Sequence, residues 1–245
     1  MATTSIEWTD RTWNPVTGCT KLSKGCENCY AAVMSRRLKG MRKPKYVNGF
    51  KVTLHSDSLA EPTQWKNPCV IFVCSMSDLF HKDVPFEFID KVFSVIKDTP
   101  QHNYQILTKR AERMAEYFET RKIPHNVWIG VTVENEDTKS RIDYIRCLDA
   151  TVKFLSCEPL LGDLGELNLE GVNWIIVGGE SGSQARPMKE EWVLNIKRQA
   201  DANNIPFFFK QWGTWSKDGV KGNKKINGKL LQGRIVQNMP YVNRK

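Results

Sequence analysis

The chain has 245 residues, of which 40% are hydrophobic and 26% are charged, and its formal net charge is +9. This is the composition of an ordinary globular protein with a sizeable core, and no apolar run approaches the ~20 residues that a membrane span requires. The polar start MATTSIEWTD contains no secretory signal. We therefore expect a cytoplasmic protein without a membrane partner, whose seven cysteines do not form a disulfide framework.

The positive charge is concentrated in two segments. Residues 36–45 (RRLKGMRKPK) carry six basic side chains and no acid, and residues 217–245 carry eight basic side chains and only Asp218 as an acid. Concentrated basic segments on a chain that is otherwise slightly acidic favour a polyanionic partner, although solvated loops have the same composition.

Short β-branched and aromatic runs recur along the chain. They are continuous and not alternating, which is typical of strands buried on both faces of a parallel sheet. The expected strands are Glu7–Pro15, Lys51–Leu54, Cys69–Cys74, Tyr104–Leu107, Val127–Val133, Val152–Leu155, Trp174–Val177 and Pro206–Phe209.

Helical patterns lie between most of these strands, with apolar residues at the i, i+3, i+4, i+7 spacing of one buried face. The connections after the second and sixth strands look short or irregular. The expected helices contain Tyr30–Leu38, Ile89–Ile96, Ala111–Phe118, Ile142–Leu148 and Trp192–Ala200.

Eight strands with mostly helical crossovers predict an α/β protein with a (β/α)8 TIM-type barrel. An open doubly wound sheet is the alternative, but GGESGS after the seventh strand lacks the GxGxxG spacing of a dinucleotide site. We expect residues 1–213 to form the barrel domain and residues 214–245 to form a basic C-terminal extension.

Polar or ionisable side chains follow nearly every expected strand. Because the carboxyl ends of the strands form the active-site face of a parallel barrel, these residues predict a ligand site. Charges crowded at such a face cost desolvation unless they meet a polar ligand. In chain order they are His55, Ser56, Asp57, Ser75, Asp78, Lys109, Arg110, Glu134, Ser156, Cys157, Glu158, Gly178, Gly179, Glu180, Arg186, Lys210 and Gln211.

Three cysteines, Cys19, Cys26 and Cys29, follow the first strand with C-x6-C-x2-C spacing. They could bind zinc with His55, His81 or Cys74 as a fourth ligand, which would close the site. The CENC sequence is formally a redox C-x-x-C motif. A third interpretation is a four-iron cluster with three irons bound by cysteine and the fourth iron open to a non-protein ligand.

Several motifs support the third interpretation through a resemblance. The chain resembles the phage and bacterial three-cysteine-motif family of radical-SAM-like proteins over residues 5–213. The motifs that carry the resemblance are WNPVTGC, KGCENCY, SMSDLFH, LTKR, IGVTVE, LSCEPLLG, WIIVGGESG with ARPM, and FFFKQWG. The resemblance implies a radical-SAM-type barrel with a [4Fe-4S] cluster on the three cysteines and S-adenosyl-L-methionine as a second cofactor.

The chain departs from the common radical SAM pattern in two places. Its cysteine spacing is not C-x3-C-x2-C, and its GGE follows the seventh strand instead of the second. We expect Tyr30 to contact the adenine, His55, Ser56 and Asp57 to hold the methionine moiety, and Ser75, Asp78 or Glu134 to hold the ribose. Gly178, Gly179 and Glu180 are further cofactor-binding candidates.

The catalytic candidates are Lys109, Glu134, Cys157, Glu158 and Lys210. The expected function is 5′-deoxyadenosyl radical chemistry on DNA, RNA or a nucleotide, by modification or lesion repair, with an electron donor such as flavodoxin or ferredoxin. The alternatives are a radical SAM enzyme for a small metabolite or peptide, and a zinc-stabilised nucleic-acid-binding protein. Nothing in the sequence indicates the oligomeric state.

Overall fold

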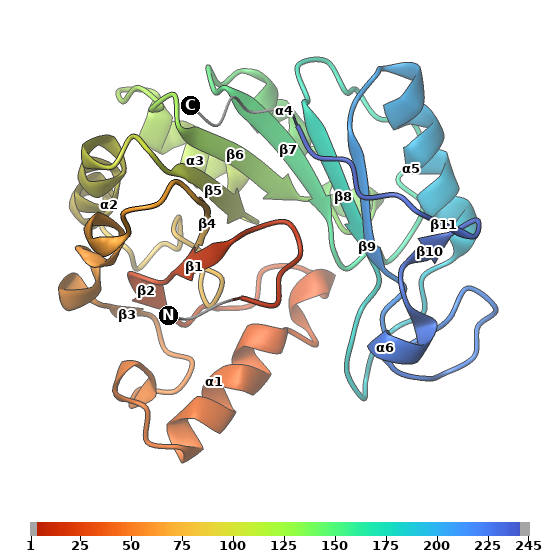
Figure 1. Ribbon diagram of the computed structural model, residues 1–245, viewed down its shortest axis with the longest axis horizontal. Coiled ribbons are helices and arrows are strands. Elements are labelled where there is room, and N and C mark those ends of the chain that lie inside the picture. Colours follow the sequence, from red (N-terminus) through yellow and green to blue (C-terminus); the bar gives the residue numbers. More distant parts are fainter. Residues whose placement is uncertain (1–3, 241–245) are drawn as a thin grey trace.

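Seven of the eight expected strands pair in one parallel sheet. The computed structural model describes residues 4–240 and shows this sheet as a curved wall through the centre of the molecule (Figure 1). In spatial order its strands are β1 (Arg11–Trp13), β4 (Val70–Val73), β5 (Asn103–Thr108), β6 (Val127–Thr132), β7 (Val152–Cys157), β8 (Trp174–Gly178) and β9 (Phe207–Gln211).

The predicted α/β class and curled parallel sheet are confirmed, with one strand fewer than expected. Within residues 4–240 no pairing joins β1 to β9, so the sheet is a half-barrel and not a closed one.

The missing strand is the expected run Lys51–Leu54. Only β3 (Thr53–Leu54) forms there, and it pairs antiparallel with β2 (Val16–Thr17) outside the main sheet. Two features explain the difference. Proline has no N–H for a ladder, so β1 ends before Pro15, and the residues after it pair with Thr53–Leu54 in a separate sheet. In addition, Leu54 is 37% exposed, whereas a strand of the main sheet is buried on both faces.

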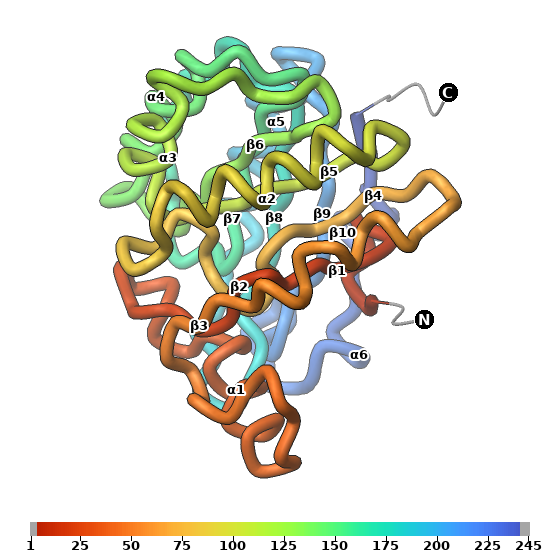
Figure 2. Tube along the Cα trace, turned by 90° about the vertical axis from the view of Figure 1, so that its left-hand side faces the viewer, coloured from red at the N-terminus to blue at the C-terminus, as the bar shows by residue number. Residues whose placement is uncertain are grey.

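All five expected helices form. They are α1 (Tyr30–Gly40), α2 (Phe86–Asp98), α3 (Ala111–Phe118), α4 (Arg141–Arg146) and α5 (Glu190–Ala202), and a short α6 (Lys224–Asn227) follows. Helices α2 to α5 cover the convex side of the sheet, whereas α1 lies beyond the strand ends (Figures 1 and 2). No helix among the described residues has the length and apolar character needed to span a membrane.

The two faces of the sheet carry different cores. The convex face contributes aliphatic side chains such as Ile129, Leu155 and Val177 to a large core shared with the helices. The concave face is filled by aromatic rings, which we call the aromatic floor. Its members are Trp8, Phe72, Trp128, Phe154, Trp174 and Phe208.

The C-terminal segment lies along the free edge of β9. Phe209 donates its N–H to the Val236 carbonyl over 2.7 Å, and Asn238 donates to the Phe207 carbonyl over 3.1 Å. On the same segment, the Lys229 ammonium lies 3.1 Å from the Glu7 carboxylate, just before β1. The segment thus links both edges of the open sheet. Its last strands are β10 (Leu230–Leu231) and β11 (Arg234–Ile235).

Gly130 on β6 is opposite Phe154 on β7, and a Cβ at this position would lie 2.4 Å from the ring. The ring cannot retreat because it is fully buried against Trp174. We therefore expect Gly130→Ala to lower the free energy of unfolding by about 1–3 kcal/mol, measured by urea denaturation.

The G130A/F154L double variant should recover much of that loss, since leucine lacks the distal ring atoms. Gly40→Ala is the matched control, because no heavy atom lies within 4 Å of the added Cβ. Equal stability of G130A and G40A would show that the contact with Phe154 does not restrict this position.

Candidate functional site

Side chains alternate along each strand, and this alternation decides which residues meet where the strands end. Phe154 belongs to the concave aromatic floor, so Ser156 and Glu158 face the same side. Cys157 belongs instead to the convex core beneath the helices. We use the term mouth for the concave side of the strand ends, formed by Lys109, Glu134, Ser156, Glu158 and Lys210.

The cysteine segment, residues 18–29, lies beside this mouth. It begins at Gly18, whose φ is +82° and whose added Cβ would lie 2.2 Å from the Lys51 carbonyl oxygen, so only glycine fits. Gly18 also bridges Ser77 in parallel, four residues after the end of β4. The segment ends at Cys29, the N-cap residue of α1. The three cysteines are therefore held between the ends of β1 and β4 and the start of a helix.

Arg110, after β5, makes the first contact between the strand ends and the cysteine segment. Its guanidinium donates to the Thr20 carbonyl over 3.1 Å and lies 3.6 Å from the Cys19 sulfur. The Asp78 carboxylate, 3.1 Å away, orients it. Asp78 also accepts hydrogen bonds from the Thr108 hydroxyl and the Lys109 N–H. Because its oxygens accept these hydrogen bonds, Asp78 positions Thr108, Lys109 and Arg110 at the end of β5.

Glu134, after β6, makes the second contact. The Ser23 hydroxyl donates to it over 2.8 Å, and the Lys109 ammonium and the Arg141 guanidinium each lie 3.1 Å away. Only 1% of the Glu134 side chain is exposed. A Cβ on Gly25 would lie 2.5 Å from this carboxylate, so the cysteine segment approaches it as closely as a glycine allows.

Glu180, after β8, makes the third contact. Arg186 binds it through two side-chain nitrogens, at 2.6 Å and 3.0 Å, and through its backbone N–H at 2.8 Å. These hydrogen bonds lower the pKa of Glu180 although burial opposes the shift. Asn28 donates to the same carboxylate over 3.0 Å, and Arg186 reaches Glu27 over 2.9 Å. Glu180 thus holds the two residues between Cys26 and Cys29, Asn28 directly and Glu27 through Arg186.

The three cysteines are free thiols and each is partly exposed. Burial and the negative charge of Asp78 raise the pKa of Cys19 to about 11, against the opposing effect of Arg110. A thiol with this pKa stays protonated at neutral pH. It becomes a thiolate when a bound metal supplies the compensating positive charge.

The spacing of the side chains bears on which metal would fit. Within residues 4–240 no three His, Cys, Asp or Glu side chains converge closely enough to hold one metal ion. Sulfurs around a single zinc ion lie about 3.8 Å apart, because each is bound ~2.3 Å from a shared centre. Sulfurs of a cubane cluster bind different iron atoms and are farther apart. Cys19, Cys26 and Cys29 supply thiol sulfurs, which are the donors that hold both zinc ions and iron–sulfur clusters in proteins.

The histidines considered as a fourth zinc ligand have other partners. The His55 ring nitrogen lies 2.8 Å from the Thr17 hydroxyl. In His81, one ring nitrogen lies 2.7 Å from the Thr20 hydroxyl, and the other accepts the Asp83 N–H over 3.1 Å. Both nitrogens of His81 are thus engaged. Burial lowers the pKa of both rings, so each remains neutral at neutral pH.

The remaining mouth residues form a second ion pair. The Lys210 ammonium lies 2.7 Å from the Glu158 carboxylate, to which Ser156 donates over 3.3 Å. A Cβ on Gly178 would lie 2.9 Å from the same carboxylate.

Tyr30 donates its hydroxyl to the Ser75 carbonyl. Burial of this hydroxyl end raises the pKa of Tyr30, and the charges of Cys29 and Glu158 raise it further.

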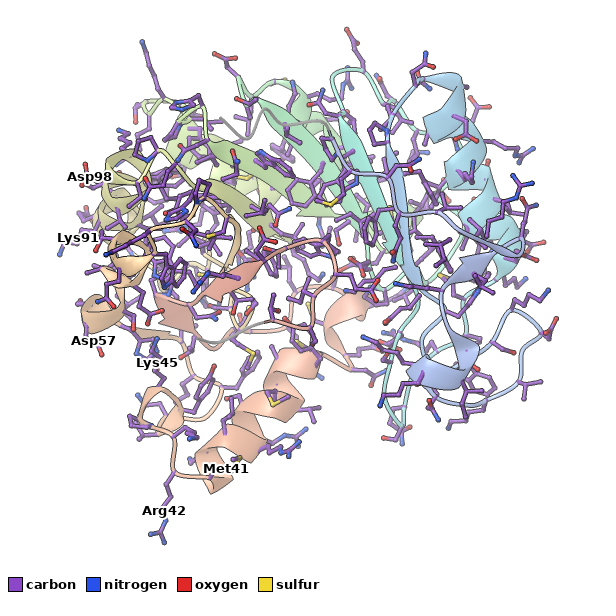
Figure 3. All side chains as sticks on the ribbon, viewed as in Figure 1. Met41, Arg42, Lys45, Asp57, Lys91 and Asp98 are labelled. Carbon is purple, nitrogen blue, oxygen red and sulfur yellow. The ribbon has the colours of Figure 1, made fainter. Side chains whose placement is uncertain are left out.

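Several predicted site residues lie apart from the mouth. Ser56 and Asp57 are exposed in a 3-10 turn, and Figure 3 shows Asp57 at the edge of the molecule. Cys157 is fully buried in the convex core, where burial raises its pKa. Gly179 is packed so tightly that a Cβ would lie 1.9 Å from the Trp212 carbonyl oxygen, which indicates a structural requirement for glycine.

Sequence reasoning missed four residues of the site. Asn14 follows β1 and accepts from Ser75 and from the Met76 N–H, so the strand-end rule could have found it. Ser23 and Asn28 lie inside the cysteine motif but gave no separate signal. Arg141 is on α4, seven residues beyond Glu134, and no sequence pattern distinguishes it from a solvated helix residue.

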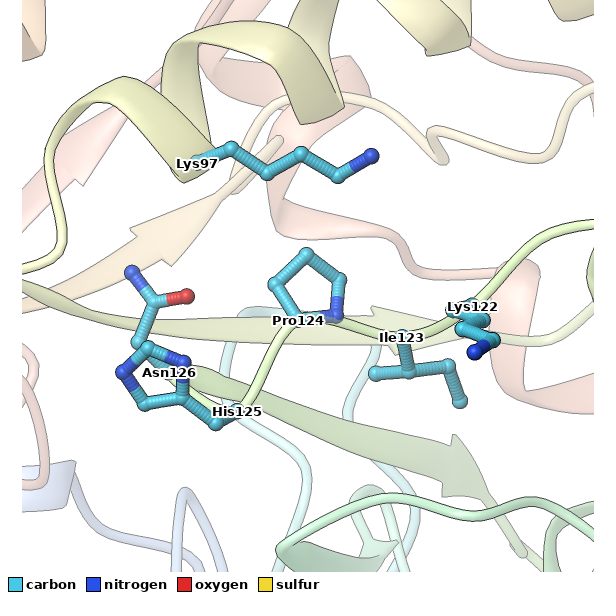
Figure 4. A pocket seen from close by; sticks show the side chains of 6 residues that line it. All are labelled: Lys97, Lys122, Ile123, Pro124, His125 and Asn126. Carbon is cyan, nitrogen blue, oxygen red and sulfur yellow. The ribbon is translucent and has the colours of Figure 1, made fainter.

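A cavity lies away from these residues, near the start of β6 and the end of α2 (Figure 4). It is lined by Lys97, Lys122, Ile123, Pro124, His125 and Asn126. None of the predicted site residues takes part in it, since the amino ends of parallel strands lie opposite the mouth.

Comparisons with known proteins give one family and one distant structural likeness. A family described as "Protein of unknown function (DUF5131)" matches residues 3–240. No curated protein matches. A solved structure titled "Spore photoproduct lyase complexed with dinucleoside spore photoproduct" aligns with a TM-score of 0.44 and 9% identity. The alignment covers 76% of this chain and 59% of that one.

We expect Glu134→Gln to lower the free energy of unfolding by about 2–3 kcal/mol, because the neutral amide leaves Lys109 and Arg141 as partly buried cations without a counter-charge. Urea denaturation at neutral pH measures this loss. The exposed Glu119→Gln is the matched control and should change stability by less than about 0.5 kcal/mol. A wild-type midpoint for E134Q would contradict the role given to this carboxylate.

Proposed function

We propose that this chain, which belongs to the DUF5131 family, is an iron–sulfur enzyme of the radical S-adenosylmethionine type. One observation carries the proposal. Three strand-end groups, Arg110, Glu134 and Glu180, each bind the cysteine segment and hold it beside a polar half-barrel mouth. A purely structural metal site would not need to face such a mouth.

Cys19, Cys26 and Cys29 would hold a [4Fe-4S] cluster, and their number leaves one iron without a protein ligand. When bound, the reduced cluster and S-adenosylmethionine together would supply a 5′-deoxyadenosyl radical for hydrogen abstraction. The chain's own contribution is to fix the thiolates. Arg110 donates toward the Cys19 sulfur, and such a donor stabilises the negative charge of the sulfur.

The mouth offers both charges that the methionine end of the second cofactor requires. Glu158 accepts from an ammonium group, and Lys210 donates to a carboxylate. In the present structure these two residues satisfy each other over 2.7 Å. A zwitterion could replace each half of the pair with a matching charge, so neither partly buried group would lose its partner. Tyr30 directly follows Cys29, and its hydroxyl donates to the Ser75 carbonyl after β4.

The substrate class we propose is a nucleic acid or nucleotide. Its support is the second basic segment, where Lys221, Lys224 and Lys225 are exposed on and around α6. Figure 1 shows α6 beyond the strand ends, on the far side from α1. Trp212 is 2% exposed and packs on Phe209, so it is not available to stack on a base. Trp215 is only half-buried, with Lys221 over its ring.

Anaerobic reconstitution with iron and sulfide tests the reaction class. We expect a brown protein with about four iron atoms per chain, and formation of 5′-deoxyadenosine after reduction in the presence of S-adenosylmethionine. Cys26→Ala should lose the iron and the product while keeping the thermal midpoint of the apoprotein. Cys147→Ser, at an exposed cysteine outside the motif, is the control and should retain both. A colourless protein with one zinc per chain would overturn the proposal.

Binding of single-stranded oligonucleotides tests the substrate class. Affinity should fall steeply with salt, and K221E/K224E/K225E should weaken binding at least about tenfold and flatten the salt dependence. The control K82E/K91E/K97E makes the same change of charge on and before α2 and should bind as the wild type does. Salt-independent binding, or equal losses in both variants, would contradict a nucleic-acid site near α6.

A further inference from the structure

Exposed apolar side chains are unevenly distributed over the molecule. Among the described residues, thirteen large hydrophobic side chains are exposed, and seven of these lie between residues 22 and 54. They are Leu22, Tyr30, Val33, Met34, Met41, Val47 and Leu54. Scattered exposed hydrophobics need no explanation, but a concentration around one helix marks an interaction surface.

Four of these residues form a regular stripe along α1, three of them in the helix and Met41 at its C-cap. Tyr30, Val33, Met34 and Met41 follow the i, i+3, i+4, i+11 spacing that places side chains on one helix face. Their exposed fractions are 57%, 56%, 40% and 55%. Arg37 falls at the i+7 position of the same face. We call these five residues the α1 stripe.

Apart from Tyr30, whose hydroxyl donates to the Ser75 carbonyl, the residues of the stripe are not needed to fasten the helix. Only Ala31 and Ser35 of α1 are buried, and Ser35 holds the helix to the Gly49 carbonyl over 2.6 Å. The far end, with Met41 and Arg42, projects away from the body of the molecule (Figure 3). The side chains of Val33, Met34, Arg37 and Met41 therefore face solvent within the described part of the chain.

Composition and charge define what would cover the stripe. Tyrosine, methionine and arginine are enriched at protein–protein interfaces, whereas exposed valine and methionine offer nothing to a phosphate backbone. The neighbouring residues Arg36, Lys39, Arg42, Lys43 and Lys45 are basic, and the segment 36–45 contains no acid. The complementary surface is thus an apolar patch surrounded by acidic side chains.

The position of the stripe defines the role of that partner. Cys29 caps the N-terminus of α1, and Tyr30 is both the next residue and the first of the stripe. A protein docked on α1 would therefore lie beside the cysteine segment, whose last residue is Cys29. Because the proposed chemistry consumes electrons, the partner that fits this position is a redox protein.

We propose that the α1 stripe is the docking site of a small acidic electron-carrier protein. This inference rests on the proposed function, because it is the proposed chemistry that requires an electron. The reduced carrier loses one electron, the cysteine-bound cluster gains it, and no covalent bond or proton has to move. The basic residues steer the carrier toward α1, and the apolar stripe holds it there.

The test uses a flavodoxin as the probe and the V33E/M34E double variant. We expect the dissociation constant for flavodoxin, measured by calorimetry at low salt, to rise at least tenfold, which is about 1.4 kcal/mol. Reduction of the reconstituted protein by photoreduced flavodoxin should slow in proportion. Reduction by dithionite should be unchanged, because a small reductant needs no docking surface.

Ile226→Glu on α6 is the matched control, since Ile226 is 77% exposed but lies outside the stripe. It should bind flavodoxin as the wild type does. R36E/R37E should weaken binding and its dependence on salt without removing an apolar group.

Equal flavodoxin affinity of V33E/M34E and wild type would overturn the proposal. If V33E/M34E lost affinity for oligonucleotides alone, the proposal would also be overturned, and the stripe would be assigned to nucleic acid. Binding is measured on the apoprotein as well. A protein that binds flavodoxin through the stripe but forms no cluster would contradict the proposed function and leave the docking site standing.

Discussion

A buried carboxylate at the end of β6 (Glu134) ties the candidate site to the sheet. Its three partners come from the cysteine segment, the end of β5 and helix α4. A charge with 1% of its side chain exposed is costly unless every oxygen is paired, so the three elements must be in place together. Asp78 and Glu180 repeat this arrangement at the ends of β4 and β8. The cysteine segment, which has little regular structure of its own, takes its shape from these acids.

Most strands of the sheet and several residues of the candidate site could be predicted from the sequence, because buried strands are continuous apolar runs and site residues follow them directly. The runs that became β4 to β9 are continuous and apolar, and two of the acids that follow them, Glu134 and Glu158, lie at the mouth. Alternation along β7 could also have shown that Cys157 and Glu158 cannot face the same side. Partnerships such as Arg141 with Glu134, or Asn28 with Glu180, depend on how distant segments approach one another, and no local pattern records that.

The open sheet explains why the barrel expectation was right in class and too large by one strand. A strand of a parallel sheet needs apolar residues on both faces, and Lys51–Leu54 does not have them. Where a closed barrel would join its first and last strands, residues 229–238 lie between β9 and Glu7 instead. Part of the expected basic extension therefore covers an edge that would otherwise expose unpaired backbone groups.

The exposed valine and methionine side chains of helix α1 do not serve the folding of this chain. An isolated helix of eleven residues is marginal in water, and α1 buries only two side chains to compensate. Its N-terminus is nevertheless fixed, by the fastened cysteine segment before it and by Tyr30 on the Ser75 carbonyl. Polar residues on its outer face would serve solubility better than valine and methionine do. Their presence beside the three cysteines is therefore better explained by a contact with another molecule than by the stability of this chain.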